Sequence, residues 1–187
     1  IDIVENVLIE FNKEIVGALN KTSCEACSVT TKKSNVILVR PERIELGFVG
    51  IPERIETNII KNIIDNKKIP VLAPMGLDDK GLPYNINADT AAGAVAKALS
   101  SRRLLLMTNV EGVYDKNKIL MPEITTAEAN RMIDEKIIVS GMIPKINTCI
   151  DALKNGVRGV VIIDGRKKHS ILYEIFSDKG AGTLIRQ

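Results

Sequence analysis

Apolar residues recur at helical spacing near the start of the chain. Val4, Val7, Phe11 and Ile15 repeat every three or four positions, which predicts a helix over about residues 4–20. The same kind of spacing predicts helices at about 55–64 and 143–155, and an alanine-rich stretch predicts one at 89–100. Further helices are expected at about 125–133 and 169–176. Thr125 and Glu128 have the spacing of a capping box, which marks the start of the helix at 125.

Short apolar runs at 35–39, 69–73, 103–108, 157–163 and 183–185 predict strands between these helices. Strands that alternate with helices and are continuously apolar indicate a largely parallel sheet covered on both faces. We therefore expect the α/β class, as a three-layer α/β/α sandwich. Ligands of such sheets bind beyond the carboxyl ends of the strands, which directs attention to the loops after Ala73, Thr108 and Ile163.

Composition places the chain among ordinary globular proteins, with 45% hydrophobic and 26% charged residues. The net charge of +3 is too balanced for a nucleic-acid surface, and the 3% aromatic content disfavours base stacking. No apolar run approaches the ~18 residues of a membrane-spanning helix. No signal peptide is recognisable. We expect one cytoplasmic domain without nucleic-acid or membrane partners.

The three cysteines are Cys24, Cys27 and Cys149. Cys24 and Cys27 have the spacing of a metal or redox pair, but there is no second pair and His169 is the only histidine. A zinc site needs about four ligands, so ordinary reduced cysteines are favoured and no protein-bound metal is expected.

Polar residues alternate in the loop that precedes the predicted helix at 89–100, at Asn85, Asn87 and Asp89. In one interpretation Asp89 is the helix N-cap and the asparagines are turn residues. In the other the segment is a substrate loop, in which an amide grips a small ligand and a carboxylate orients cations. Spacing alone favours the first interpretation.

Two later segments suggest a site for phosphates. The strand at 103–108 runs into a turn at Gly112 and then Tyr114, which suits a nucleotide, but no glycine fingerprint surrounds Gly112 and a β-hairpin turn stays open. Pro144 suits the first turn of the helix at 143–155. Backbone amides there favour an anion and Lys145 adds a positive charge, although an exposed surface lysine is the simpler alternative.

Several segments share an order and spacing that is specific when they are taken jointly. They are Leu46–Gly50, Ile69–Pro74, Tyr84–Gly93, Leu105–Val113, Ser140–Lys145, Asp164–Arg166, His169–Phe176 and Gly180–Ile185. Together they resemble the acetylglutamate kinases of the amino-acid kinase superfamily, and the resemblance covers the whole chain.

The resemblance implies an amino-acid kinase domain over residues 1–187, with the nucleotide-binding part at 69–187. It implies transfer of a phosphoryl group from ATP, with Mg²⁺, to the γ-carboxylate of N-acetyl-L-glutamate in arginine biosynthesis. Asn85 would bind acetylglutamate, Asp89 would organise the catalytic lysines, and Lys145 would stabilise the transition state. The implied nucleotide contacts are Asn109, Val110, Glu111, Gly112, Val113, Tyr114, Ile137, Ile138 and Val139.

The C-terminal pattern resembles that of arginine-sensitive members, which implies an L-arginine effector site at His169, Glu174 and Gly182. A carboxylate such as Glu174 pairs well with a guanidinium. The alternative is that Glu174 belongs to a solvated helix face. The resemblance also implies a homo-oligomer.

The chain departs from the family pattern in two ways. The family's N-terminal third, with its lysine, glycine-rich phosphate loops and substrate-binding arginine, has no counterpart here. Serine and threonine stand in the segment 28–33 where glycines are expected, and Lys33 stands where an aspartate is expected. The alternatives are therefore an inactive nucleotide-binding fragment, or another amino-acid kinase such as an aspartate or uridylate kinase.

Overall fold

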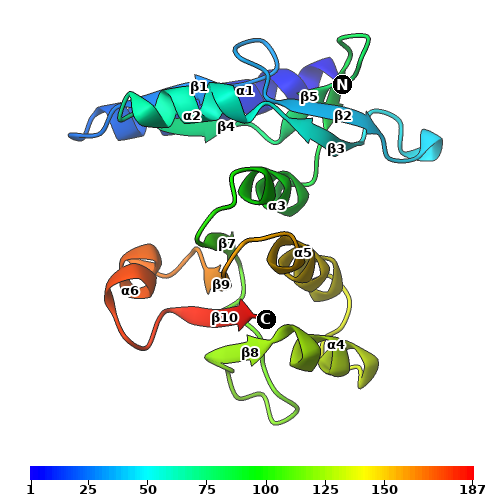
Figure 1. The fold of residues 1–187 in the computed structure, drawn as a ribbon, viewed down its shortest axis with the longest axis vertical. Coiled ribbons are helices and arrows are strands. Elements are labelled where there is room, and N and C mark those ends of the chain that lie inside the picture. The colour runs from blue at the N-terminus through cyan, green and yellow to red at the C-terminus, as the bar shows by residue number, and fades with distance from the viewer. The chain divides into compact units, whose positions relative to one another are not determined.

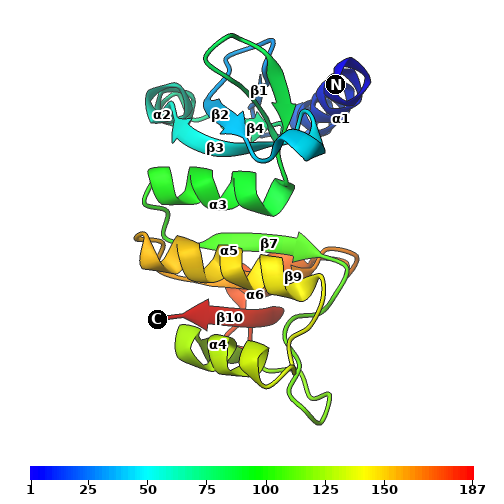
Figure 2. The ribbon, with the colours of Figure 1, turned by 90° about the vertical axis from the view of Figure 1, so that its right-hand side faces the viewer.

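Two units make up the chain, Ile1–Ala98 (unit 1) and Leu99–Gln187 (unit 2), and the computed structural model describes all 187 residues. In unit 1, β1 and β4 form a parallel pair, with α1 and α2 on opposite sides of it (Figure 2). A second sheet has the strand order β3-β2-β5-β6, and α3 packs against β3. The elements of unit 1 are α1 (Asp2–Asn20), β1 (Ala26–Val29), β2 (Ile37–Pro41), the 3₁₀ turn η1 (Ile44–Leu46), β3 (Gly50–Ile55), α2 (Thr57–Asp65), β4 (Ile69–Leu72), β5 (Met75–Leu77), β6 (Pro83–Asn85) and α3 (Ala88–Ala98).

The fully buried side chains of helix α1 are polar. Its two buried residues are Glu5 and Asn12. The Asn12 amide donates to the carbonyl of Val71 in β4 (2.8 Å), and Asn12 Oδ1 accepts a hydrogen bond from Ser28 in β1. Of the apolar residues that predicted this helix, Val4, Val7, Phe11 and Ile15 are exposed.

Unit 2 is built on one four-stranded sheet with the order β7-β9-β10-β8. Figure 1 shows α6 on one face of this sheet and α4 and α5 on the other, which is a three-layer arrangement. All five residues of β9 are buried, as expected for a strand covered on both faces. The elements of unit 2 are β7 (Leu104–Thr108), β8 (Glu123–Thr125), α4 (Thr126–Asp134), α5 (Met142–Lys154), β9 (Val160–Asp164), α6 (Ser170–Phe176) and β10 (Gly182–Arg186).

The α/β class is confirmed, and so are the six predicted helices. The capping box is present: the Thr125 hydroxyl accepts the Glu128 N–H (3.2 Å), and the Glu128 carboxylate accepts the Thr125 N–H (2.7 Å). One expected boundary moves, because Ile55 ends β3 and α2 begins only at Thr57.

The strand pairings differ from the single, largely parallel sheet that the sequence predicted. Three sheets are present, and the pairs β1–β4, β2–β5, β7–β9 and β8–β10 are parallel. The pairs β2–β3, β5–β6 and β9–β10 are antiparallel. Five short strands, β1, β3, β5, β6 and β8, had not been predicted. The extent of the domain and of its nucleotide-binding part remains a prediction.

Candidate functional site

The carboxyl ends of β7 and β9 lie side by side, because these strands pair in parallel with Thr108 opposite Asp164. The Gly165 N–H donates to the Thr108 carbonyl (2.8 Å), which ties together the two loops that follow. These are the predicted nucleotide segment 109–114 and the segment 164–167. In Figure 2 the loop after β7 and the first turn of α5 lie at the same end of the sheet.

Glu111 joins two other side chains of these loops, Lys167 and Tyr114. Its carboxylate is 2.5 Å from the Lys167 ammonium and accepts a hydrogen bond from the Tyr114 hydroxyl (3.0 Å). The contact with Lys167 lowers the pKa of Glu111 below its usual value and raises the pKa of Lys167. Loss of hydration, followed by the bond to Glu111, raises the pKa of Tyr114. The carboxylate is therefore ionised near neutral pH.

Asp164 at the end of β9 forms a second ion pair at this edge. Its buried carboxylate accepts two hydrogen bonds from the Arg166 guanidinium, at 3.0 and 2.9 Å, and one from the Arg166 backbone N–H (2.9 Å). These bonds lower the pKa of Asp164 to about 2. The Arg166 side chain remains 69% exposed. The loop therefore presents to solvent a guanidinium that is paired with Asp164.

Thr183 in β10 anchors the segment 109–114. The Thr183 hydroxyl accepts the Val113 N–H (2.8 Å) and donates to the Met121 carbonyl (2.6 Å). A Cβ on Gly112 would lie 2.3 Å from the Thr183 hydroxyl oxygen. Gly112 therefore allows a close backbone approach that no other residue would permit. Val113 is buried, whereas Asn109 and Tyr114 are exposed.

The second predicted nucleotide segment, Ile137–Val139, connects α4 to α5. Ile138 is buried in the core and Val139 is exposed. The N–H groups of Ile137 and Ile138 both donate to the Met132 carbonyl (2.9 and 3.0 Å). The half-buried side chain of Ile137, exposed Val139 and the carbonyl groups of the segment therefore remain for a nucleotide contact.

Lys145 is half-buried in the first turn of α5. The N–H of Met142 already donates to the Val139 carbonyl (3.2 Å) and that of Ile143 to the Ser140 carbonyl (3.1 Å), while Pro144 has no N–H. The predicted backbone amides are thus engaged, and the charge offered to an anion comes from Lys145 and the helix dipole. Ser140, in the preceding turn, has a left-handed φ of 48°.

In unit 1, Asn85 ends β6, and its N–H donates to the Phe48 carbonyl (2.9 Å). Asn87 caps α3, because its side-chain oxygen accepts the N–H groups of Asp89 (3.0 Å) and Thr90 (3.2 Å). The interpretation of Asp89 as the N-cap is therefore wrong. Asp89 lies within the first turn of α3 and is half-buried.

The three predicted effector residues separate in the structure. Glu174 and Gly182 line a cavity of about 220 Å³. Glu174 is buried, so the alternative of a solvated face is wrong for this residue. A Cβ on Gly182 would lie 2.0 Å from the Ile162 carbonyl oxygen, so this glycine is required for the packing of β10 on β9.

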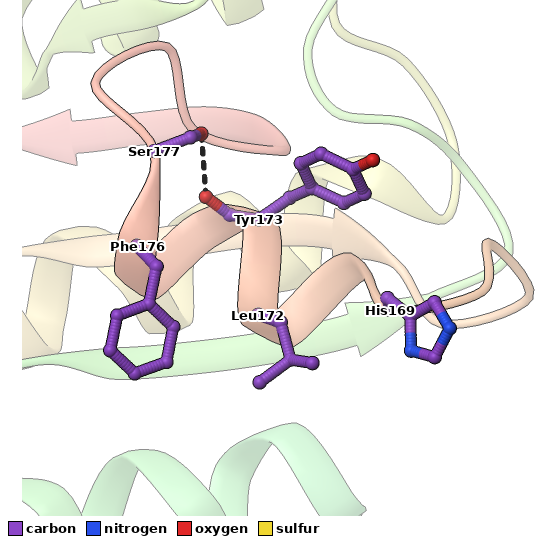
Figure 3. A pocket seen from close by; sticks show the side chains of 5 residues that line it. All are labelled: His169, Leu172, Tyr173, Phe176 and Ser177. Atoms are coloured by element: carbon purple, nitrogen blue, oxygen red, sulfur yellow. Dashed lines mark hydrogen bonds between the residues drawn. The ribbon is translucent and has the colours of Figure 1, made fainter.

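His169 instead lines a separate apolar groove of about 550 Å³ along α6, with Leu172, Tyr173, Phe176 and Ser177. Figure 3 shows Leu172 and Phe176 on the same side of the helix, and the Ser177 hydroxyl donating to the Tyr173 carbonyl (2.6 Å). His169 precedes α6 in a left-handed conformation, with φ of 63°.

Sequence reasoning missed Arg103, Arg166, Lys167 and Thr183 as members of these clusters. A signal existed for Arg166 and Lys167, because the loop after Ile163 had been selected as a carboxyl-end loop. Arg103 and Thr183 lie in segments predicted as strands, but their partners are 71 and 70 residues away and leave no local signal. No group of three or more His, Cys, Asp or Glu residues could hold a metal ion. No helix has the length and apolar character needed to cross a membrane.

Comparison with known proteins identifies the family. The model of the amino acid kinase family matches residues 2–164. The chain belongs to the amino acid kinase family. It is 54% identical over its full length to the acetylglutamate kinase of Pelagibacter ubique, covering 65% of that protein. It is 45% identical to the acetylglutamate kinase of Rhodopseudomonas palustris strain BisB18, covering 67% of it. The chain thus spans about two thirds of the length of these relatives.

Among solved structures of similar fold is the N-acetylglutamate synthase of Neisseria gonorrhoeae in complex with coenzyme A and L-arginine. The match has a TM-score of 0.80 and 25% identity, and covers 88% of this chain and 38% of the synthase. The amino acid kinase fold that the sequence predicted is confirmed by the family match.

Proposed function

We propose that this amino acid kinase chain belongs to an enzyme that transfers the γ-phosphoryl group of ATP to the γ-carboxylate of N-acetyl-L-glutamate. The observation that carries the proposal is the 54% identity, over the entire chain, with an acetylglutamate kinase. Asn85, Asp89 and Lys145 occur at the positions that the family motifs assign to substrate and catalysis.

The chemistry explains why a lysine rather than a general base is central. The γ-carboxylate of acetylglutamate has a reference pKa of ~4.3, so it is already an ionised nucleophile at neutral pH. It attacks the γ-phosphorus, and the bond from that phosphorus to the β–γ bridging oxygen breaks to release ADP. Catalysis then consists of positioning and of lowering the repulsion between two anions. Lys145, supported by the dipole of α5, suits that task.

The nucleotide would lie over the loop 109–114, beside Glu111 and Lys167. Mg²⁺ commonly binds through phosphates and a few carboxylates rather than in an all-protein cage. Mg²⁺ held by ATP would neutralise part of the phosphate charge. Arg166 and Lys167 would add cations at the same edge.

A substrate panel tests the assignment. The protein is incubated with MgATP and N-acetyl-L-glutamate, L-aspartate or uridine monophosphate, and ADP is measured. We expect ADP formation that depends on N-acetyl-L-glutamate alone. Formation with aspartate or uridine monophosphate would point to another amino-acid kinase. Saturable ATP binding without any acceptor-dependent ADP would point to a nucleotide-binding protein.

We also propose that L-arginine inhibits the reaction through the cavity beside Glu174. Support comes from the buried carboxylate in that cavity and from the arginine complex of the related synthase. Titration of the ADP assay with L-arginine tests this, and lack of inhibition at millimolar concentration would contradict it.

Self-association is proposed through the exposed face of α1. Val7 and Phe11 on this face are 57% and 58% exposed, whereas the two buried residues of the helix, Glu5 and Asn12, are polar. A second copy would cover this stripe and gain hydrophobic burial. Sedimentation analysis of Phe11→Glu should show smaller particles than the unmodified protein. Ile44→Glu, which changes an exposed apolar residue outside α1, should have no effect.

A further inference from the structure

Glu174 is a buried carboxylate with two hydrogen-bond partners. Its side chain is 7% exposed and extends from α6. One oxygen, Oε1, accepts a hydrogen bond from Arg103 Nη1 at 3.2 Å. The other, Oε2, accepts the backbone N–H of Ala181 at 3.0 Å. Since a buried carboxylate is costly without partners, both contacts belong to the folded state of unit 2.

The turn before β10 is shaped to reach this carboxylate. Gly180 has a φ of 66°, and a Cβ there would lie 2.8 Å from Glu174 Oε2. The positive φ favours glycine, and a side chain at this position would have to displace the Glu174 carboxylate. The turn brings the Ala181 N–H onto one oxygen and leaves the other oxygen for a cationic donor.

The cavity beside Glu174 carries charges of both signs. Arg103 and Lys179 supply cations, and Glu123, Glu174 and Asp178 supply carboxylates. Glu123 is already paired with Arg186. The volume of about 220 Å³ and the mixed charge suit a small zwitterion with a cationic side chain. Glu174 is the deepest of the carboxylates and the natural partner of a guanidinium.

In this structure a guanidinium already occupies that position, and it belongs to the chain itself. Arg103 lies just before β7, and its side chain is 46% exposed. One hydrogen bond joins it to the cavity wall, and the rest of its guanidinium is left for solvent. We propose that Arg103 is a tethered internal ligand of Glu174, and that a guanidinium-bearing amino acid binds this cavity by displacing it.

The physical consequence is competition between a tethered and a free guanidinium. A site that is competent for only a fraction of the time binds its ligand with an affinity reduced by that fraction. Arg103 thereby sets the concentration at which the free amino acid binds. This inference rests on the proposed effector role of the cavity, but it concerns binding and does not require phosphoryl transfer by the chain.

Calorimetric titration with L-arginine, without ATP or acetylglutamate, tests the inference on three single variants. Arg103→Ala should bind L-arginine about tenfold more tightly or better than the unmodified protein, because the internal competitor is gone. Arg102→Ala removes a neighbouring exposed arginine with no contact to Glu174 and should bind as the unmodified protein does. Glu174→Gln should abolish binding.

Arg103→Ala leaves the Glu174 carboxylate with only one partner and could destabilise the fold. A second measurement therefore tests the site through the stability of this variant. Methylguanidinium should raise the melting temperature of Arg103→Ala toward that of the unmodified protein, whereas methylammonium at the same concentration should raise it less. Arg103→Ala, Glu174→Gln should show no such rescue.

Several outcomes would overturn the inference. Weaker or unchanged L-arginine binding by Arg103→Ala would mean that Arg103 contacts the ligand or is irrelevant to it. Absence of binding in both proteins would mean that the cavity is not an amino-acid site. Because no substrate is present, these outcomes differ from a failure of the kinase assignment, which the ADP assay reports separately.

Discussion

The two units bury their long helices in opposite ways. In unit 2, α5 buries an apolar face that includes Ile146, Ile150 and Leu153. In unit 1, α1 buries Glu5 and Asn12 and leaves Val7 and Phe11 exposed. Apolar periodicity therefore identifies both helices, but it identifies the face that meets the unit's own sheet only for α5. For α1 the apolar stripe indicates a surface that another chain can cover.

The largest expected effect is on stability. It compares a glycine of unit 2 that has no room for a side chain with a glycine of unit 1 that has room. Gly182→Ala places a methyl group 2.0 Å from the Ile162 carbonyl oxygen and should lower the free energy of unfolding by about 3 kcal/mol. Gly17→Ala in α1 meets nothing within 4 Å and should raise it by about 0.5–1 kcal/mol. Urea unfolding measures both. A small loss for Gly182→Ala would mean that β10 is less tightly packed than described.

The next effect is on the reaction rate and concerns Lys145 in the first turn of α5. Lys145→Ala should lower the rate of acetylglutamate-dependent ADP formation by about 10²-fold or more, as the loss of one electrostatic stabiliser does. Lys154→Ala, at the opposite end of the same helix, should leave the rate unchanged. A decrease below about threefold for Lys145→Ala would remove this lysine from the proposed mechanism.

A smaller effect, specific to unit 2, should appear in acid. Arg166 lowers the pKa of Asp164 to about 2 in the folded protein, from a usual value of 3.8. Because the folded pKa is depressed, this carboxylate stabilises the fold above about pH 4 and loses that contribution as the pH falls toward 2. The melting-temperature difference between the unmodified protein and Asp164→Asn should shrink across that interval. A constant difference would rule out ionisation of Asp164 as the cause.

The smallest effects test backbone strain in each unit. Ser34 and Ser140 have positive φ values of 61° and 48°. Ser34→Gly and Ser140→Gly should each raise the free energy of unfolding by about 0.5–1 kcal/mol, because glycine adopts this conformation without strain. Ser101→Gly has no positive φ to relieve and should lower the free energy slightly. A loss of stability in all three variants would contradict the strain argument.

Long helices and strands with strong local signals could be predicted from the sequence. The box at Thr125 and Glu128 and the apolar runs of β7 and β9 were recognised, because each depends on neighbours in the chain. The short strands β3 and β5 were missed, because Pro52 and Gly76 interrupt any strand pattern and only their partners define them. A Cβ on Gly76 would lie 2.4 Å from the Ile37 carbonyl oxygen, a constraint that no local pattern reveals.

The candidate site divides in the same way. The motifs at Asn85, Asp89 and Lys145 could be recognised because each is a continuous segment. The ion pairs of Glu111 with Lys167 and of Glu174 with Arg103 join residues that are far apart in the chain. Such pairs arise from strand order and turn geometry, so they could be found only in the folded protein.

Detection of the acyl phosphate itself tests the central claim most directly. The protein is incubated with MgATP, N-acetyl-L-glutamate and hydroxylamine, which traps an acyl phosphate as its hydroxamate. N-acetyl-L-glutamine, which has an amide in place of the γ-carboxylate, serves as the matched control. We predict γ-hydroxamate in amounts equal to the ADP formed, with acetylglutamate only, and little with Lys145→Ala. Bound ATP without hydroxamate from the unmodified protein would contradict the assignment of phosphoryl transfer to this chain.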